Sequence, residues 1–216
     1  MDRRFKVAVL VECHPYDIVN FQKMLWSFED CDCYVQPFDL FIQDAENRDS
    51  YDTVLYYSMS LPLPEEGSDR YRYMVRELGN TIQGIILMHH ALLSFPRWDI
   101  YTEVSGVKVR CEEQFQFHQN ERVDQYIVDK GHPVMNGIDK FTLIDETYEI
   151  GETEELGNTI SIETDNPSGM HKIAWTRRYK NSRVFCYASG HDNNVYGNEN
   201  FRRIMHQAIH WTAGEH

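Results

Sequence analysis

Gln83-Gly84-Ile85-Ile86-Leu87-Met88-His89-His90-Ala91-Leu92-Leu93 is the stretch on which the predicted fold depends. Its apolar run from Gly84 does not alternate with polar residues, which is typical of a strand buried on both faces of a parallel sheet. Two histidines follow the run directly. In open α/β sheets, ligands bind at the edge formed by the carboxyl ends of the strands. We therefore expect His89 and His90 to lie at a ligand site, and the alternative is a pair of core histidines held by hydrogen bonds.

Strand and helix patterns alternate through the first part of the chain. Strands are expected at residues 5–11, 34–38, 51–57 and 84–88. Helices are expected at residues 17–28 and 70–78. This order predicts an α/β fold with a doubly wound, mainly parallel sheet and helices on both faces. The strands at 5–11, 53–57 and 84–88 should be adjacent or one apart.

The segments after Trp98 are shorter and more polar. Strand-like segments are expected at residues 107–110, 114–118, 122–128, 141–150, 159–163, 172–176 and 183–187. An amphipathic helix is expected at residues 200–213. Because the chain shows no repeat, low-complexity segment or interdomain linker, we expect one domain over residues 1–216.

Composition and charge limit the classes of partner. The chain carries 21 Lys and Arg against 34 Asp and Glu, a net charge of −13. Nucleic acids and anionic membranes call for clustered basic residues, so we expect neither as the main partner. The chain shows no apolar run of membrane-spanning length and no signal-peptide pattern. With five cysteines expected to be reduced thiols, the predicted location is the cytoplasm.

Several ionisable residues follow expected strands and could meet at one edge of the sheet. His14 follows the first strand, His89 and His90 follow the strand at 84–88, and His191 follows the strand near 184–188. Glu146, beside Asp145, interrupts a run that is otherwise apolar or aromatic. A carboxylate near imidazoles can fix a histidine tautomer, act as a general base or bind a metal. The alternative for Glu146 is a solvated strand edge.

Other candidates carry weaker patterns. His118 follows Phe115 and Phe117, which also fits a surface histidine packed on aromatic rings. Cys13 is next to His14, but adjacent side chains on an extended chain point in opposite directions, so we expect no Cys–His nucleophile. No glycine-rich nucleotide loop is present, and no nucleotide cofactor is expected. We assign no chemistry to His171, His206, His210 and His216.

Together these segments resemble the ThuA-like (trehalose-utilisation) proteins over nearly the whole chain. The residues that carry the resemblance are His14, Gly84-Ile-Ile-Leu-Met-His89-His90-Ala91, Ser105-Gly106, Phe117-His118, His132-Pro-Val-Met-Asn-Gly-Ile138, Asp145-Glu-Thr-Tyr148, Ala174-Trp-Thr-Arg177, Arg183-Val-Phe185, Gly190-His-Asp192 and Ile209-His-Trp211. Each piece is weak alone, whereas their order and spacing together are specific.

The resemblance implies a flavodoxin-like fold within the class I glutamine-amidotransferase-like superfamily. It places His89 at the elbow where amidotransferases carry their cysteine, and His191 at the position of the triad histidine. With no thiol at the elbow, glutamine hydrolysis should be absent. Relatives are associated with the use of trehalose and similar disaccharides through keto-sugar intermediates.

We therefore expect a carbohydrate-metabolism enzyme acting on a disaccharide or keto-sugar by acid–base chemistry. His89 or His90 would pair with His191, and Glu146 would orient them or share their protons. Candidate substrate-binding residues are His14, His118, Tyr148, Trp175 and Asp192. The sequence leaves two alternatives open: an enzyme that uses a divalent metal such as Zn²⁺ at the same histidines, and a non-catalytic sugar-binding or regulatory module. A homo-oligomer is compatible with the sequence.

Overall fold

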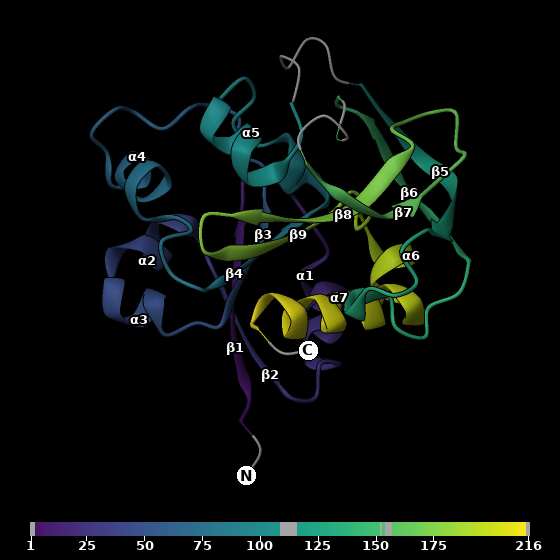
Figure 1. The fold of residues 1–216 in the computed structure, drawn as a ribbon, viewed down its shortest axis with the longest axis horizontal. Coiled ribbons are helices and arrows are strands. Elements are labelled where there is room, and N and C mark those ends of the chain that lie inside the picture. The colour runs from purple at the N-terminus through teal and green to yellow at the C-terminus, as the bar shows by residue number, and fades with distance from the viewer. Residues whose placement is uncertain (1–2, 109–115, 152, 154–156, 215–216) are drawn as a thin grey trace.

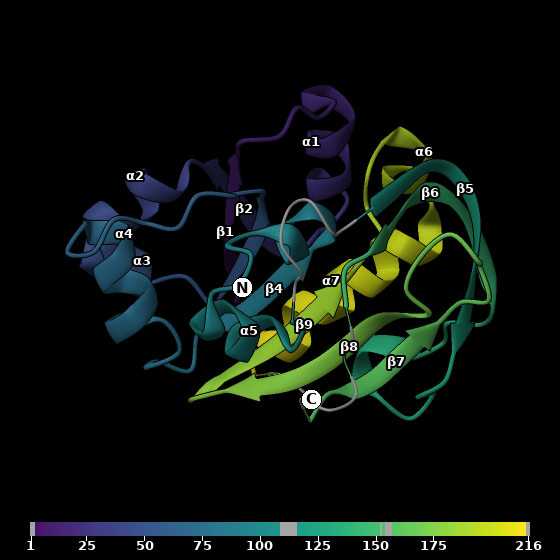
Figure 2. The ribbon, with the colours of Figure 1, turned by 90° about the horizontal axis from the view of Figure 1, so that it is seen from above.

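The fold is an α/β sandwich built on one nine-stranded mixed sheet (Figures 1 and 2). The computed structural model describes residues 3–108, 116–151, 153 and 157–214. The strands, in chain order, are β1 (Phe5–Glu12), β2 (Cys31–Gln36), β3 (Thr53–Ser58), β4 (Gly84–Met88), β5 (Gln116–Ile127), β6 (Phe141–Glu149), β7 (Thr159–Glu163), β8 (Lys172–Tyr179) and β9 (Ser182–Tyr187). Their spatial order is β2-β1-β3-β4-β9-β8-β7-β5-β6.

The two halves of the sheet pair differently. The five strands β2-β1-β3-β4-β9 are parallel, as in a flavodoxin-like fold. β8, β7, β5 and β6 extend the sheet by antiparallel pairing. The predicted α/β class is confirmed, and the neighbouring positions predicted for β1, β3 and β4 are confirmed as well. Parallel pairing is confined to these five strands, because the described connections from β5 to β9 contain no crossover α-helix.

Helices cover both faces of the parallel half. They are α1 (Ile18–Trp26), α2 (Phe38–Gln43), α3 (Ala45–Asp49), α4 (Asp69–Arg72), α5 (Asp99–Ser105), α6 (Asn193–Tyr196) and α7 (Glu199–Thr212). A π-helical turn, Tyr73–Glu77, continues α4, and 3-10 turns cover His89–Leu93 and Pro133–Met135. In Figure 2, α1, α6 and α7 gather on one side of the sheet and α2, α4 and α5 on the other. Among the described residues, no helix combines the length and apolar character needed to cross a bilayer.

Several sequence predictions of elements were wrong. The strand predicted at 34–38 is β2, which begins at Cys31 and ends at Gln36 because Pro37 caps α2, whose Phe38 and Phe41 are buried instead of continuing the strand. The helices α2, α3, α5 and α6 were not expected. Residues 116–118 and 122–127 of the segments predicted at 114–118 and 122–128 belong to the single strand β5, which has a bulge between His118 and Glu121. Residues 107–108 of the segment predicted at 107–110 are not in a strand, and residues 109–110 and 114–115 lie outside the described residues.

The central strand β4 packs closely against α7 at Gly84. All five residues of β4 are buried, as its unbroken apolar run predicts. The Thr53 hydroxyl on β3 lies 2.6 Å from the Thr212 hydroxyl of α7, and Thr212 donates to Ala208 O. A Cβ on residue 84 would lie 2.5 Å from Thr212 Cβ and 2.7 Å from Thr212 C, which leaves no room for a side chain. Glycine is therefore needed for the approach of α7 to the sheet.

We expect Gly84→Ala to lower the free energy of unfolding by about 1–3 kcal/mol, the usual cost of overpacking a tight core. Urea denaturation followed by circular dichroism would measure it. Gly131→Ala is the matched control: a Cβ at this position would meet nothing nearer than 3.8 Å, so its stability should stay close to the original. Equal stability of both variants would contradict the proposed close packing.

Candidate functional site

Three parallel strands bring histidines to one edge of the sheet. His14 follows β1, His89 follows β4, and His191 follows β9. The ring of His14 is stacked on that of His90, with centroids 4.2 Å apart, and lies 5.9 Å from that of His191. His89 and His191 have ring centroids 5.2 Å apart. The carboxyl edge of the parallel half thus carries four imidazoles in contact.

The backbone bends sharply where two of these strands end. Cys13 has φ +61° and His89 has φ +53°. Such left-handed conformations are costly for residues other than glycine and cluster at functional sites. His89 opens its 3-10 turn directly after the last residue of β4. His89 thus begins a sharp turn at the carboxyl end of β4.

The hydrogen bonds of His89 fix its tautomer. Its Nδ1 lies 2.7 Å from Ala188 O, and because a carbonyl oxygen only accepts, Nδ1 carries the proton. In the neutral ring, Nε2 is then an acceptor, and the Tyr148 hydroxyl lies 2.6 Å from it. His191 Nδ1 lies 3.2 Å from the same atom. His89 is therefore held as a base that faces Tyr148 and His191.

Glu146 supplies the negative charge of the cluster. Its Oε1 lies 3.6 Å from His89 Nε2 and 3.7 Å from His191 Nδ1, and Gln119 donates to its Oε2 at 3.1 Å. Burial would raise the pKa of Glu146. Hydrogen bonding and positive charge from His89 in its protonated form, aided by Tyr148 and His191, instead lower this pKa to about 2. Glu146 is therefore a carboxylate at neutral pH, suited to stabilise an imidazolium.

Asp145 holds His191 in place. Its carboxylate is buried and accepts three backbone N–H bonds, from Glu146 at 2.9 Å, Gly190 at 2.9 Å and His191 at 3.0 Å. Burial raises the pKa of Asp145, and the His89 charge and these hydrogen bonds oppose that rise. The residue ties β6 to the turn after β9. The sequence pattern at 145–146 drew attention to Glu146, but it did not reveal this role of its neighbour.

Buried His90 and half-buried His14 carry buried ring nitrogens without partners among the described residues. Neither nitrogen of His90, nor His14 Nδ1, has a hydrogen-bond partner among the described residues. Burial, followed by the charges of His89 and His14, lowers the pKa of His90 to about 2, so this ring stays neutral. Burial likewise lowers the pKa of His14. Buried polar atoms normally have partners, so these nitrogens are available to a ligand or to water.

The remaining candidates from the sequence have different surroundings. Tyr148 joins the cluster, but through its hydroxyl and not as an exposed ring. Trp175 is fully buried and donates from Nε1 to Ser105 O at 2.8 Å, so it packs in the core and cannot stack on a sugar there. His118 faces Glu149 at 3.3 Å on the rim of the sheet. Asp192 caps α6 and, with His191, lines a cavity of about 100 Å³.

The exposure of the three clustered groups differs. The side chain of His191 is 23% exposed, whereas those of His89 and Glu146 are 0% and 6% exposed. The small cavity beside His191 is also lined by Gln119, the residue that bonds Glu146. His191 is therefore the member of the cluster that a ligand from solvent can reach first.

Comparison with known proteins places the chain in a family. The model of the ThuA family, described as trehalose utilisation, matches residues 29–212. The chain belongs to the ThuA family. A search of the curated proteins finds no match. The family match confirms the resemblance seen in the sequence, and it associates the chain with trehalose utilisation and carbohydrate metabolism.

Solved structures share the fold. A protein described as ThuA-like from Parabacteroides merdae ATCC 43184 is 18% identical, with a TM-score of 0.75 over 98% of this chain and 91% of its own. Another from Bacteroides uniformis ATCC 8492 is 16% identical, with a TM-score of 0.70 over 97% and 91%. A candidate GMP synthase protein from Thermoplasma acidophilum is 10% identical, with a TM-score of 0.58 over 97% and 94%. At these identities the likeness concerns the fold alone.

The lowered pKa of Glu146 predicts a pH-dependent contribution to stability. The folded state holds fewer protons on this group than the unfolded chain, whose glutamates titrate near pH 4.3. The contribution is complete above that pH and is lost as the pH falls toward about 2. The stability difference between the original protein and Glu146→Gln should therefore shrink over this range in denaturant titrations. A difference that stays constant from pH 6 to pH 3 would contradict the charge network.

The described thiols are poorly suited to nucleophilic chemistry. Burial raises the pKa of Cys13, Cys31, Cys33 and Cys186, so each favours the protonated form. Cys111 lies outside the described residues. We expect Cys13→Ser to retain turnover of the substrate within a few-fold. A loss of two or more orders of magnitude with folding intact would instead point to a thiolate nucleophile.

Proposed function

We propose that this ThuA-family chain is an enzyme of carbohydrate metabolism that moves a proton next to a carbonyl or glycosidic carbon of a disaccharide or keto-sugar. The observation that carries this proposal is the contact of one ionised carboxylate, Glu146, with two imidazoles, of which His191 is open to solvent. General acid–base catalysis needs such a group within reach of the substrate, and histidine titrates close to neutral pH.

In this proposal His191 exchanges the proton with the substrate. Its Nδ1 faces His89 Nε2 and the Glu146 carboxylate, which leaves its Nε2 for the substrate. When His191 takes up a proton, the nearby Glu146 charge stabilises the resulting imidazolium. His89 and Tyr148 hold the inner side of the ring in a fixed hydrogen-bonding arrangement. Asp145 acts as a positioning residue, because it holds the backbone of His191 and touches no substrate.

The remaining histidines are proposed to bind sugar hydroxyls. His14 and His90 present buried nitrogens that lack partners among the described residues. A neutral imidazole can donate from one nitrogen and accept at the other, which suits hydroxyl groups. Asp192 and His118 would act from the rim. The prediction that Trp175 stacks on a sugar ring was wrong, since its ring is enclosed by the core.

Glutamine amidotransferase activity is not part of this proposal. The residue that the sequence resemblance assigns to the elbow is His89, an imidazole and not a thiol, and its φ of +53° supports a sharp turn there. The four described cysteines are free but have raised pKa values. Free thiols also agree with the proposed cytoplasmic location.

The metal-dependent alternative rests on the same cluster. One ligand atom each from His89, Glu146 and His191 lies within 4.8 Å of the others, which a divalent ion could bridge. The Tyr148 hydroxyl, however, lies 2.6 Å from the His89 Nε2 lone pair that the metal would need. This contact favours acid–base chemistry without a metal. Turnover that is lost with a chelator and restored by Zn²⁺ would reverse that preference.

We expect His191→Ala to lower turnover roughly 10²–10⁴-fold, the usual contribution of a general acid–base group. Because the side chain is partly exposed, the melting temperature should change little. Incorporation of deuterium from D₂O beside the carbonyl of a keto-disaccharide, followed by mass spectrometry, would measure the reaction. Trehalose should be tested in parallel for hydrolysis.

His171→Ala is the matched control, since His171 is exposed and bonds Thr164 O away from the cluster. It should exchange deuterium at the original rate. Equal rates for both variants would overturn the assignment of His191. Binding of the sugar without turnover by the original protein would favour the non-catalytic module.

A further inference from the structure

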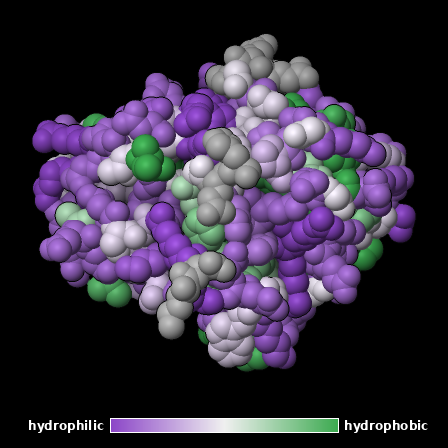
Figure 3. All heavy atoms as spheres, turned by 60° about the horizontal axis from the view of Figure 1, so that its bottom comes forward, coloured by the Kyte–Doolittle hydropathy of each residue, from purple (hydrophilic) through white to green (hydrophobic). Residues whose placement is uncertain are grey.

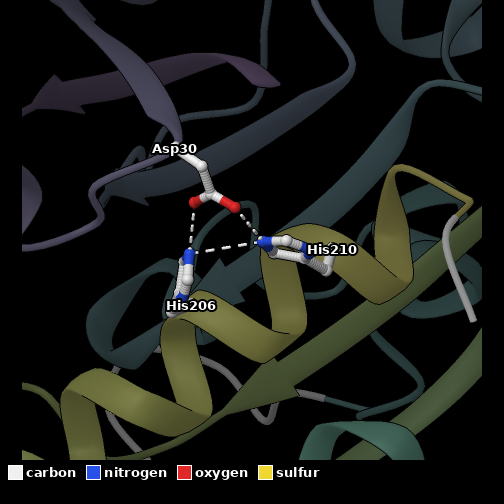
Figure 4. A group of neighbouring side chains, drawn as sticks. All are labelled: Asp30, His206 and His210. Atoms are coloured by element: carbon white, nitrogen blue, oxygen red, sulfur yellow. Dashed lines mark hydrogen bonds and ion pairs between the residues drawn. The ribbon is translucent and has the colours of Figure 1, made fainter. Parts of the chain in front are cut away.

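A second cluster of histidine and carboxylate lies at the opposite edge of the sheet. Asp30 immediately precedes β2, so it lies at the amino end of the parallel strands. His206 and His210 are one turn apart on α7, and Figure 4 shows both side chains directed at the Asp30 carboxylate. The histidines of the candidate active site follow the carboxyl ends of their strands. The two clusters are therefore separate sites.

Three ligand atoms converge in this second cluster. His206 Nε2 lies 2.5 Å from Asp30 Oδ1, and His210 Nε2 lies 2.9 Å from Asp30 Oδ2. The two Nε2 atoms are 3.2 Å apart. In octahedral or tetrahedral coordination with bonds of about 2.1 Å, neighbouring ligand atoms lie roughly 3.0–3.4 Å apart. The imidazoles already have that spacing, and the carboxylate would need to withdraw by about half an ångström.

Packing holds both rings in position. Phe28 stacks on His206 at 5.6 Å with an interplanar angle of 7°, and Phe5 contacts the ring of His210 at 4.5 Å. The i, i+4 spacing places both rings on one face of α7. Two metal-ligating atoms therefore come from a rigid helix, and the third comes from the turn that α7 packs against. Such preorganisation reduces the cost of assembling a metal site.

The charge state of the cluster suits a cation. The Asp30 carboxylate oxygens lie 2.5 Å and 2.9 Å from the two imidazole Nε2 atoms. Two imidazole nitrogens and one carboxylate oxygen this close must share either protons or a metal ion to avoid repulsion between their lone pairs. A metal ion would take the place of the protons on the two Nε2 atoms.

The site is also accessible. His206 and His210 line a groove of about 500 Å³ together with residues of the 130–136 loop and Trp211. The three side chains are between 29% and 42% exposed. An ion can therefore reach the ligand atoms without unfolding the chain.

Figure 3 shows one face of the molecule, where hydrophilic residues surround small, separated apolar spots.

We propose that Asp30, His206 and His210 form a binding site for a divalent first-row transition metal such as Zn²⁺. Two imidazoles and one carboxylate are a ligand set that such ions favour, and it leaves coordination positions open for water or a further ligand. The ion would join the C-terminal helix α7 to the turn before β2. This site is independent of the function proposed for the opposite edge.

Titration of the metal-free protein with Co²⁺, followed by its visible absorption, tests the site, and Zn²⁺ should displace the Co²⁺. We expect the original protein to bind Co²⁺ and to melt at a higher temperature with Zn²⁺. Asp30→Asn, His206→Ala and His210→Ala should each weaken binding at least tenfold, because even changes around metal ligands cost 10–100-fold. Circular dichroism in EDTA would show that each variant is folded, and Asp30→Asn preserves the side-chain shape.

Two controls separate this site from its surroundings. His132→Ala removes another histidine of the same groove, one that accepts a hydrogen bond from Val134 N, and should leave Co²⁺ affinity unchanged. His191→Ala disrupts the cluster at the opposite edge and should also preserve this binding. The proposal is overturned if the original protein binds no Co²⁺, if the folded triad variants bind as tightly as the original, or if His132→Ala or His191→Ala abolishes binding.

Discussion

The candidate active site depends on the buried carboxylate of Asp145. This group accepts backbone N–H bonds from Glu146, Gly190 and His191, so one side chain joins strand β6 to the turn after β9. A buried carboxylate is costly unless such donors compensate it, and these three do so. The same bonds fix the backbone positions from which the side chains of Glu146 and His191 extend. The antiparallel half of the sheet thereby supplies the carboxylate, Glu146, that lies beside the histidines of the parallel half.

The cluster also shows how several imidazoles can be buried together. His90 stays neutral through burial, and His89 donates from Nδ1 to Ala188 O. Glu146 provides the negative charge that a protonated ring needs. In the result, the Glu146 carboxylate lies beside both His89 and His191, and His191 is the more exposed of these two imidazoles. This division of roles supports the proposed proton-transfer site over a set of core histidines.

Much of this arrangement could be predicted from the sequence. The unbroken apolar runs of β1, β3 and β4 fix their place in the parallel sheet, and strands of one direction bring His14, His89 and His191 to one edge. The family motifs place Glu146 beside them.

Other features depend on tertiary contacts that no local pattern encodes. The position of Trp175 in a motif did not distinguish a core ring from an exposed one. The role of Asp145 follows from the path of a turn 45 residues away. In the sequence, His206 and His210 look like ordinary polar positions of an amphipathic helix. Their partner Asp30 is 176 residues from His206, so no local pattern connects them. The antiparallel half was foreseen only as short strands, since its pairing order depends on a register that local patterns leave open.

A crystal structure of the protein soaked with a non-hydrolysable or slowly reacting keto-disaccharide tests the proposed site most directly. We expect sugar density at the carboxyl edge of the parallel strands. A sugar oxygen or acidic carbon should lie within hydrogen-bonding distance of the outer nitrogen of His191, and hydroxyls should contact His14 or His90. Sugar bound elsewhere on the molecule, with the cluster of His89, Glu146 and His191 untouched, would contradict the proposed site.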